Sequence, residues 1–280
     1  MKKLFFLIPL LLMGSLLCAQ ESSPVSPAFY GPNAFPVPEI ELEWSASDLS
    51  FETGPQLASL KGFSLQDDVT LDGYFKLRFP LFSNRVALTI WGEAYDWFRS
   101  SAEANALRGV EGPSQGGRVG EISISTDILL LHQEEHYLNL LLRSALKSAA
   151  GEYSQTHRYY DSPGYFFDMV LGRRFELRSG VDLLFAASSG FLCWQTGAHA
   201  QNDAAMYGFL AGLRLGRVHL GVHYGGYVGW QDNGDCPMSI RAEARYALKN
   251  IDFVFKYHEG LIDWPYRQFS LGLSYHFHAK

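Results

Sequence analysis

Residues 121–130 read EISISTDILL, and the alternation within this stretch decides the fold class. One face carries Ile122, Ile124, Thr126, Ile128 and Leu130. The other face carries Glu121, Ser123, Ser125 and Asp127. A period of two indicates a β-strand that separates an apolar environment from a polar one.

About twelve segments of the chain alternate in this way, so the sequence predicts an all-β fold. Several of them run to about 13–15 residues, whereas strands of globular proteins most often have about 5–6. A tilted strand needs about 9–11 residues to cross the hydrocarbon of a membrane. The predicted strands are 39–46, 68–80, 85–98, 118–132, 136–149, 164–175, 180–194, 204–216, 217–231, 238–248, 251–259 and 266–278.

Short and long gaps alternate between these segments. The short gaps fall near 81–84, 133–135, 176–179, 215–217 and 249–250. The long gaps fall at 47–67, 100–117, 150–163, 195–203, 231–237 and 259–264. An antiparallel barrel that crosses a membrane has tight turns at one end and long loops at the other, which a soluble sandwich has no reason to show. This alternation of short and long gaps predicts a transmembrane, antiparallel, up-and-down β-barrel of about twelve strands over residues 39–280.

Composition narrows the class further. The chain has 280 residues, of which 47% are hydrophobic and 15% aromatic, yet its mean hydropathy is −0.06. A helical membrane bundle, which needs apolar runs of about 20 residues, is excluded, whereas a barrel has this balance. The net charge of −6 argues against nucleic acid as a partner. Interfacial girdles are predicted at Trp44, Phe79, Trp97, Phe98, Tyr137, Tyr165, Trp230 and Trp264.

The N-terminus reads as an export signal. Two lysines precede an apolar run, and small residues follow near Ala19, so residues 1–20 are predicted to be a cleaved signal peptide. A lipoprotein signal, with Cys18 as the lipidated residue, is the open alternative. Residues 21–38 are rich in Ser and Pro and are predicted to form a periplasmic leader, because proline cannot donate to a strand ladder.

The last predicted strand ends in SLGLSYHF, residues 270–277. This stretch resembles the terminal assembly signal of bacterial outer-membrane β-barrels, in which a polar residue, a glycine and two aromatics stand at fixed spacing. The matching positions are Ser270, Gly272, Tyr275 and Phe277, and three residues follow them. The resemblance implies that the barrel-assembly machinery recognises the chain, which is then surrounded by outer-membrane lipid. It implies no particular activity.

Charges of both signs fall on the predicted inner face. They line the lumen at Asp72, Lys76, Glu93, Asp127, Arg143, Lys147, Asp168, His223, Arg241, Glu243, Arg245 and Lys256. Arg143 and Lys147 are expected to face Asp168 across neighbouring strands, and Glu243 is expected to face Lys256 and His223. Opposed charges of this kind either set the selectivity of a pore or form an ion-pair lattice that closes the lumen. Three more histidines, His219, His258 and His276, are assigned to the same face.

The third long loop is the candidate ligand contact. Its aromatic and charged side chains suit stacking and directional hydrogen bonds to a small solute, a sugar or a head group. These side chains are Tyr153, His157, Arg158, Tyr159, Tyr160 and Asp161. An ordinary surface loop has the same composition. Cys193 and Cys236 are either a disulfide pair or two thiols.

No phosphate-binding loop, dinucleotide fingerprint, nucleophile elbow or zinc spacing is present, so the sequence predicts no catalytic residues, no metal site and no cofactor. The leading interpretation is an outer-membrane barrel with a structural or transport role, either a small pore or a closed barrel with binding loops. An outer-membrane lipid hydrolase or deacylase is one alternative. A soluble, secreted β-sandwich that binds a ligand is another.

Overall fold

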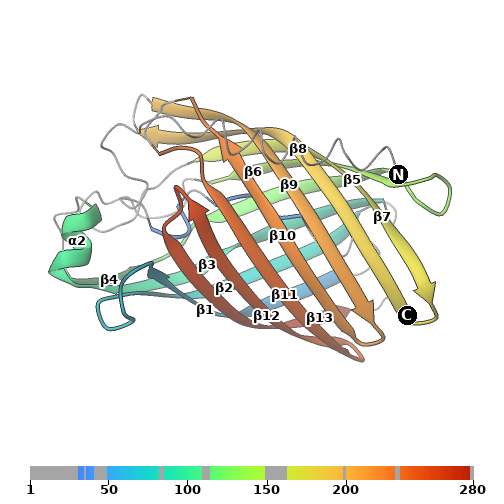
Figure 1. The fold of residues 1–280 in the computed structure, drawn as a ribbon, viewed down its shortest axis with the longest axis horizontal. Helices are drawn as coiled ribbons and strands as arrows, with labels where there is room; N and C mark the ends of the chain where they lie inside the picture. Colours follow the sequence, from blue (N-terminus) through green and yellow to red (C-terminus); the bar gives the residue numbers. More distant parts are fainter. Residues whose placement is uncertain are drawn as a thin grey trace.

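The computed structural model describes residues 31–34, 36–40, 49–81, 85–108, 114–148, 163–197, 200–230 and 234–277. Twelve long antiparallel strands form a barrel, and one short extra strand extends it (Figure 1). The barrel strands are β1 Leu49–Leu60, β2 Asp68–Leu81, β3 Val86–Ser100, β5 Ile122–Leu131, β6 Asn139–Lys147, β7 Gly164–Arg178, β8 Val181–Gly197, β9 Ala200–Leu215, β10 Val218–Val228, β11 Met238–Leu248, β12 Ile251–Ile262 and β13 Tyr266–Phe277. The extra strand is β4, Gln115–Arg118, which pairs with β3.

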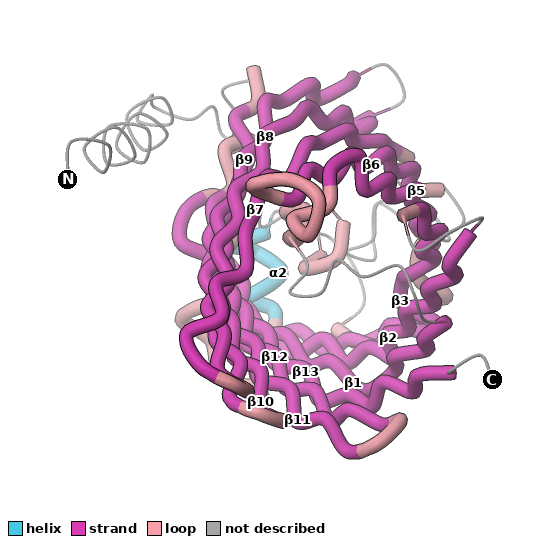
Figure 2. Tube along the Cα trace, turned by 90° about the vertical axis from the view of Figure 1, so that its right-hand side faces the viewer, coloured by secondary structure: helices cyan, strands magenta, loops and turns pink. Residues whose placement is uncertain are grey.

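A single sheet closes on itself. Each barrel strand pairs with its neighbour in the chain, and β1 pairs with β13, with Phe51 opposite Tyr275. Figure 2 looks along the barrel and shows the strands as a continuous ring. The predicted fold class and strand number are confirmed, and the stacked sheets of a soluble sandwich are excluded. In the described part of the chain, no helix is long and apolar enough to cross a membrane.

The two faces of the wall differ as the alternation predicts. On β13, Leu271 faces outward and is 61% exposed, whereas its neighbour Ser270 faces the lumen and is 5% exposed. On β12, Phe253 is exposed and Asp252 is buried. An apolar exterior around an enclosed polar interior is the pattern of a barrel that sits in hydrocarbon.

The predicted first strand is wrong. Residues 39–40 of the predicted strand 39–46 are not in a strand, and residues 41–46 lie outside the described part of the chain. The barrel strand is β1, which falls within the predicted long gap 47–67. Gly54 and Pro55 interrupt the alternation of β1 in the sequence. The pairing with β13 skips both positions, and a Cβ on Gly54 would collide with the carbonyl oxygen of Leu271.

Two of the predicted long loops are also shorter than expected. Residues 198–199 alone separate β8 from β9, and residues 263–265 alone separate β12 from β13, because the strands extend beyond the hydrocarbon-spanning length. At the opposite end of the barrel, tight turns join β7 to β8 and β9 to β10. Gly180 and Gly216 have φ of 76° and 58° in these turns, a region that favours glycine.

The long-loop end carries a helix, α2 (Ala102–Arg108), in the connection between β3 and β5 (Figure 1). Its last residue, Arg108, is fully buried and pairs with Asp68 at 2.8 Å, while its Nη1 donates to Ser100 at 2.8 Å. The guanidinium also lies over the ring of Tyr266. This loop is therefore anchored to β2, β3 and β13. Nearby, Phe98 and Trp264 are buried and are not part of an interfacial girdle.

Candidate functional site

Residues 31–34 and 36–40, called the lumen segment below, lie inside the barrel. This segment contacts Asp72 on β2, Lys147 on β6 and Trp264 in the connection between β12 and β13. Trp264 Nε1 donates to the carbonyl of Pro32 at 3.2 Å, and Lys147 Nζ donates to the carbonyl of Ala34 at 2.8 Å. Asn33 Nδ2 in turn donates to Asp72 Oδ2 at 2.7 Å. The described part of the predicted periplasmic leader 21–38 thus lies within the lumen.

Proline content explains how the wall holds this segment. Pro32, Pro36 and Pro38 lack an N–H group and prevent a strand ladder. The carbonyl groups remain as acceptors for charged donors of the wall. Arg143 Nη1 donates to the carbonyl of Glu39, and Arg241 Nη2 donates to the carbonyl of Val37, both at 2.7 Å. Such charge-assisted bonds are stronger than neutral ones.

The lumen segment packs its apolar side chains against one half of the wall. Val37 packs in a buried cluster with Phe166, Trp194 and Tyr227 among others. Ile40 lies in a second cluster, whose other members come from β5 to β9: Leu129, Leu141, Val170, Leu184, Ala186 and Leu210. The inward side chains of β5–β9 are called the apolar half below. The inward side chains of β10–β13, β1 and β2 are called the charged half.

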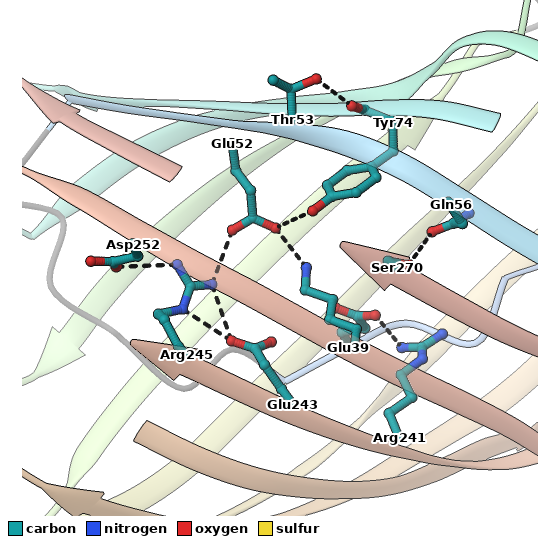
Figure 3. Close-up of polar contacts among 11 residues, drawn as sticks. Glu39, Glu52, Thr53, Gln56, Tyr74, Arg241, Glu243, Arg245, Asp252 and Ser270 are labelled. Carbon is teal, nitrogen blue, oxygen red and sulfur yellow. Dashed lines mark hydrogen bonds and ion pairs between the residues drawn. The ribbon is translucent and has the colours of Figure 1, made fainter. Parts of the chain in front are cut away.

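The carboxylate of the lumen segment points the other way, to the charged half. Glu39 Oε1 lies 3.0 Å from Arg241 Nη1 (Figure 3). The Glu39 side chain is 44% exposed within the lumen, whereas that of Arg241 is 13% exposed. The contact is therefore open on the side of Glu39.

A second cluster of charges surrounds Glu52 on β1 (Figure 3). Glu52 accepts from Arg245 at 3.0 Å, from Lys256 at 2.8 Å and from the hydroxyl of Tyr74 at 3.3 Å. Arg245 also pairs with Glu243 at 3.1 Å and lies 3.5 Å from Asp252. One buried carboxylate thus joins β1, β2, β11 and β12 across the lumen. Glu243 and Lys256 oppose each other in the ladder, as predicted, but Glu243 pairs with Arg245 and Lys256 pairs with Glu52.

The expected pair of Arg143 with Asp168 is present and bidentate. Arg143 Nε and Nη2 donate to the two carboxylate oxygens at 2.9 and 2.7 Å, and both residues are buried. Lys147, predicted to share Asp168, instead pairs with Glu121 and lies over the ring of Trp194. The lumen segment draws it toward the carbonyl of Ala34.

The remaining predicted lumen residues also face inward. Asp72 accepts from Gln56 at 3.3 Å in addition to Asn33. Asp127 lies 3.8 Å from Arg78 and accepts from Ser125 at 3.1 Å. Lys76 and Glu93 line a cavity beside the lumen segment.

In the described part of the barrel, cavities lie beside the lumen segment, and two of them border Glu39. The larger, about 190 Å³, lies along the lumen segment between Trp91, Trp194 and the charged side chains of β1, β3, β6, β11 and β12. The smaller, about 50 Å³, lies beneath Glu39 and is lined by His223, Arg241 and His258. Both cavities border Glu39 and Arg241, so this ion pair stands between them.

Other predicted residues fall outside the lumen or outside the described chain. The loop candidates Tyr153, His157, Arg158, Tyr159, Tyr160 and Asp161 all lie outside the described residues. So do the signal peptide and Cys18. Cys193 and Cys236 form no disulfide.

The C-terminal motif divides between the two faces of β13. Ser270 Oγ donates to Gln56 Oε1 at 3.0 Å in the lumen, and a Cβ on Gly272 would collide with the hydroxyl of Tyr74. Tyr275 and Phe277 are exposed on the outer face, where their rings meet edge to face.

Sequence reasoning missed Glu52 and Gln56, because it placed residues 47–67 in a loop. The alternation of Phe51, Thr53 and Leu57 with these polar residues is a usable signal once a break at Gly54 and Pro55 is allowed. Asn33 and Gln268, whose amides meet at 3.3 Å, were missed as well.

No protein-family model and no curated protein matches the sequence. Solved structures do match the fold. An outer membrane channel from Pseudomonas putida F1 superposes with a TM-score of 0.56 at 11% identity, over 86% of this chain and 100% of that one. The KdgM porin gives 0.49 at 9% identity over 82% and 99%, and LpxR from Salmonella typhimurium gives 0.49 at 9% over 81% and 100%. At such identities the likeness shows the fold, a closed barrel of the outer-membrane type.

Proposed function

We propose that this protein is an outer-membrane channel for small solutes, whose passage is narrowed by its own lumen segment. The closed barrel with an apolar exterior supports insertion into a membrane. Assembly by the barrel machinery and contact with outer-membrane lipid belong to the same proposal.

The observation that carries the transport role is the cavity of about 190 Å³ beside the lumen segment. An eight-stranded barrel is just wide enough for its own side chains to fill it, and twelve strands enclose a wider space. Here a piece of chain, not wall side chains alone, occupies part of that space. Glu39, Lys76, Glu93 and Arg143 line what remains, which suits water and polar solutes.

The contacts of the lumen segment favour a segment that narrows the passage through the barrel over one that closes it permanently. Its contacts with the wall are hydrogen bonds, one ion pair and the apolar packing of Val37 and Ile40. Such contacts exchange with water as the segment shifts. A ligand contact by the loop candidates also remains part of the proposal, as an entry site for the solute: Tyr153, His157, Arg158, Tyr159, Tyr160 and Asp161.

Planar-bilayer recording of the purified full-length protein tests this function. We expect discrete conductance steps from the unchanged chain, and larger steps from Ile40→Asp, because a carboxylate at this site drives the segment off the apolar half. Glu259→Gln, on the outer face, is the matched control and should conduct like the unchanged chain. If none of the three proteins conducts at any voltage, although heat-modifiable migration shows that they are folded, the channel is refuted and the protein is a closed barrel.

A further inference from the structure

Three basic side chains form one row across the inner wall. In the ladder, His223 on β10 lies opposite Arg241 on β11, and Arg241 lies opposite His258 on β12. All three line the smaller cavity of about 50 Å³. The row is therefore built on three adjacent strands of a rigid sheet and faces an enclosed space.

The two imidazoles of this row have nitrogens that no described group satisfies. His223 is 5% exposed, and neither of its ring nitrogens has a hydrogen-bond partner among the described residues. His258 is 6% exposed; its Nδ1 lies 3.4 Å from Gln268 Oε1, while Nε2 has no such partner. Buried polar groups of native proteins are hydrogen-bonded, so unsatisfied ring nitrogens beside a cavity indicate a ligand or water.

Arg241 differs from the other charged residues of the cavity because its carboxylate partner belongs to the lumen segment and not to the wall. Lys256 and Glu243 also line the cavity, but Lys256 pairs with Glu52 and Glu243 pairs with Arg245. Among the described residues, Arg241 pairs with the carboxylate of Glu39 from the lumen segment. That carboxylate already sits where an anion would sit, above the row.

We propose that the row His223, Arg241 and His258 is a binding site for small carboxylates, and that Glu39 is its resident occupant. The fork of Arg241 matches a carboxylate, and His223 supplies an N–H donor beside it, while His258, whose Nδ1–H faces Gln268 Oε1, lines the other side of the site. A solute carboxylate that enters the lumen replaces Glu39 at Arg241. The proposal rests on the proposed channel function for the route by which the solute arrives.

Competition by a tethered carboxylate lowers the apparent affinity for a free one. A group held on the same chain acts at an effective concentration of about millimolar or more. The site binds a free anion only in the fraction of molecules that Glu39 has left, so removal of the Glu39 charge should raise the affinity by about tenfold or more.

Titration calorimetry with acetate, on the full-length barrel purified in detergent, measures this directly. Glu39→Gln should bind acetate at least about tenfold more tightly than the unchanged protein. Adding Arg241→Gln to that variant should abolish the binding. Glu259→Gln, which removes a carboxylate paired with Arg267 on the outer face, is the matched control and should leave the affinity unchanged.

Equal acetate affinity of the unchanged protein and Glu39→Gln would overturn the proposal, as would binding that persists without Arg241. If Glu39→Gln does not fold, Ile40→Ala gives a second test, because weaker docking of the lumen segment adds no new carboxylate and should raise acetate affinity in the same direction. Calorimetry needs no open pore. A silent bilayer with tight acetate binding would therefore refute the channel alone, and conduction with no acetate binding would refute the carboxylate site alone.

Discussion

The two halves of the inner wall bind the side chains of the lumen segment through different interactions, whereas both halves donate hydrogen bonds to its carbonyl groups. The apolar half holds Val37 and Ile40 in two buried clusters, where the gain grows with the apolar area removed from water. The charged half holds Glu39 through one ion pair. Within the lumen segment, Val37 and Ile40 thus lie in an apolar environment, and Glu39 lies in a charged one.

The difference has a consequence for specificity. Apolar packing tolerates small shifts, whereas an ion pair in a poorly hydrated lumen depends on distance and on competing ions. We infer that the apolar half keeps the segment in place and the charged half decides when Glu39 leaves. Salt and anions should therefore act on the second contact and not on the first.

The largest expected effect concerns the one bidentate ion pair set within the apolar half. Asp168→Ala leaves the buried Arg143 without its carboxylate and should lower the free energy of unfolding by about 3–5 kcal/mol. Thermal unfolding in detergent, followed by heat-modifiable migration on gels, measures it. The double variant Arg143→Met, Asp168→Leu removes both charges and should lie close to the unchanged protein; an equal loss in both variants would show that shape, not charge, matters there.

The packing of the lumen segment comes next. Ile40→Ala should weaken docking of the segment by about 2–3 kcal/mol, because it removes buried contacts with the second apolar cluster. A change of 2 kcal/mol alters the ratio of docked to undocked segment by about 30-fold. The dwell time of the larger conductance step reports this ratio. Leu107→Ala, at an exposed position of α2, should leave it unchanged.

A substitution in the charge cluster around Glu52 should lower the free energy of unfolding by less than Asp168→Ala does. Glu52→Gln removes the carboxylate shared by Arg245 and Lys256, yet Arg245 keeps Glu243 and Asp252 as partners. We expect a loss of about 1–2 kcal/mol in the same unfolding experiment. A loss as large as that of Asp168→Ala would mean that the neighbouring carboxylates do not compensate.

The smallest effect is expected outside the lumen. Arg267 pairs with Glu259 at 2.9 Å on the outer face, and its side chain is 48% exposed. Exposed ion pairs contribute little to stability. Arg267→Gln should leave both the unfolding midpoint and the conductance unchanged, which separates the lumen charges from those of the rim.

Most of the fold follows from the sequence because it depends on a local rule. Period-two alternation and gap order predict eleven of the twelve barrel strands, and strand order brings Arg143 next to Asp168. The first strand fails, since Gly54 and Pro55 interrupt the alternation while the long-range pairing with β13 preserves the strand. Tertiary contact overrides local preference there.

The site was harder to predict because its central part is a segment without periodicity. Residues 31–40 have the composition of a leader, and wall residues about 20 to 230 positions away, such as Gln56, Arg143 and Trp264, place them in the lumen. His223 and His258 line one cavity with Glu39, yet no local pattern in the sequence indicates that Glu39 lies beside them.

Photo-crosslinking from position 37 tests the position of the lumen segment most directly. A leucine-sized diazirine amino acid at Val37, activated in the folded full-length protein, should insert into wall peptides that contain Phe166, Trp194 or Tyr227, as mass spectrometry would show. Insertion only into lipid, detergent or solvent, with no wall peptide recovered, would contradict a segment that lies inside the barrel.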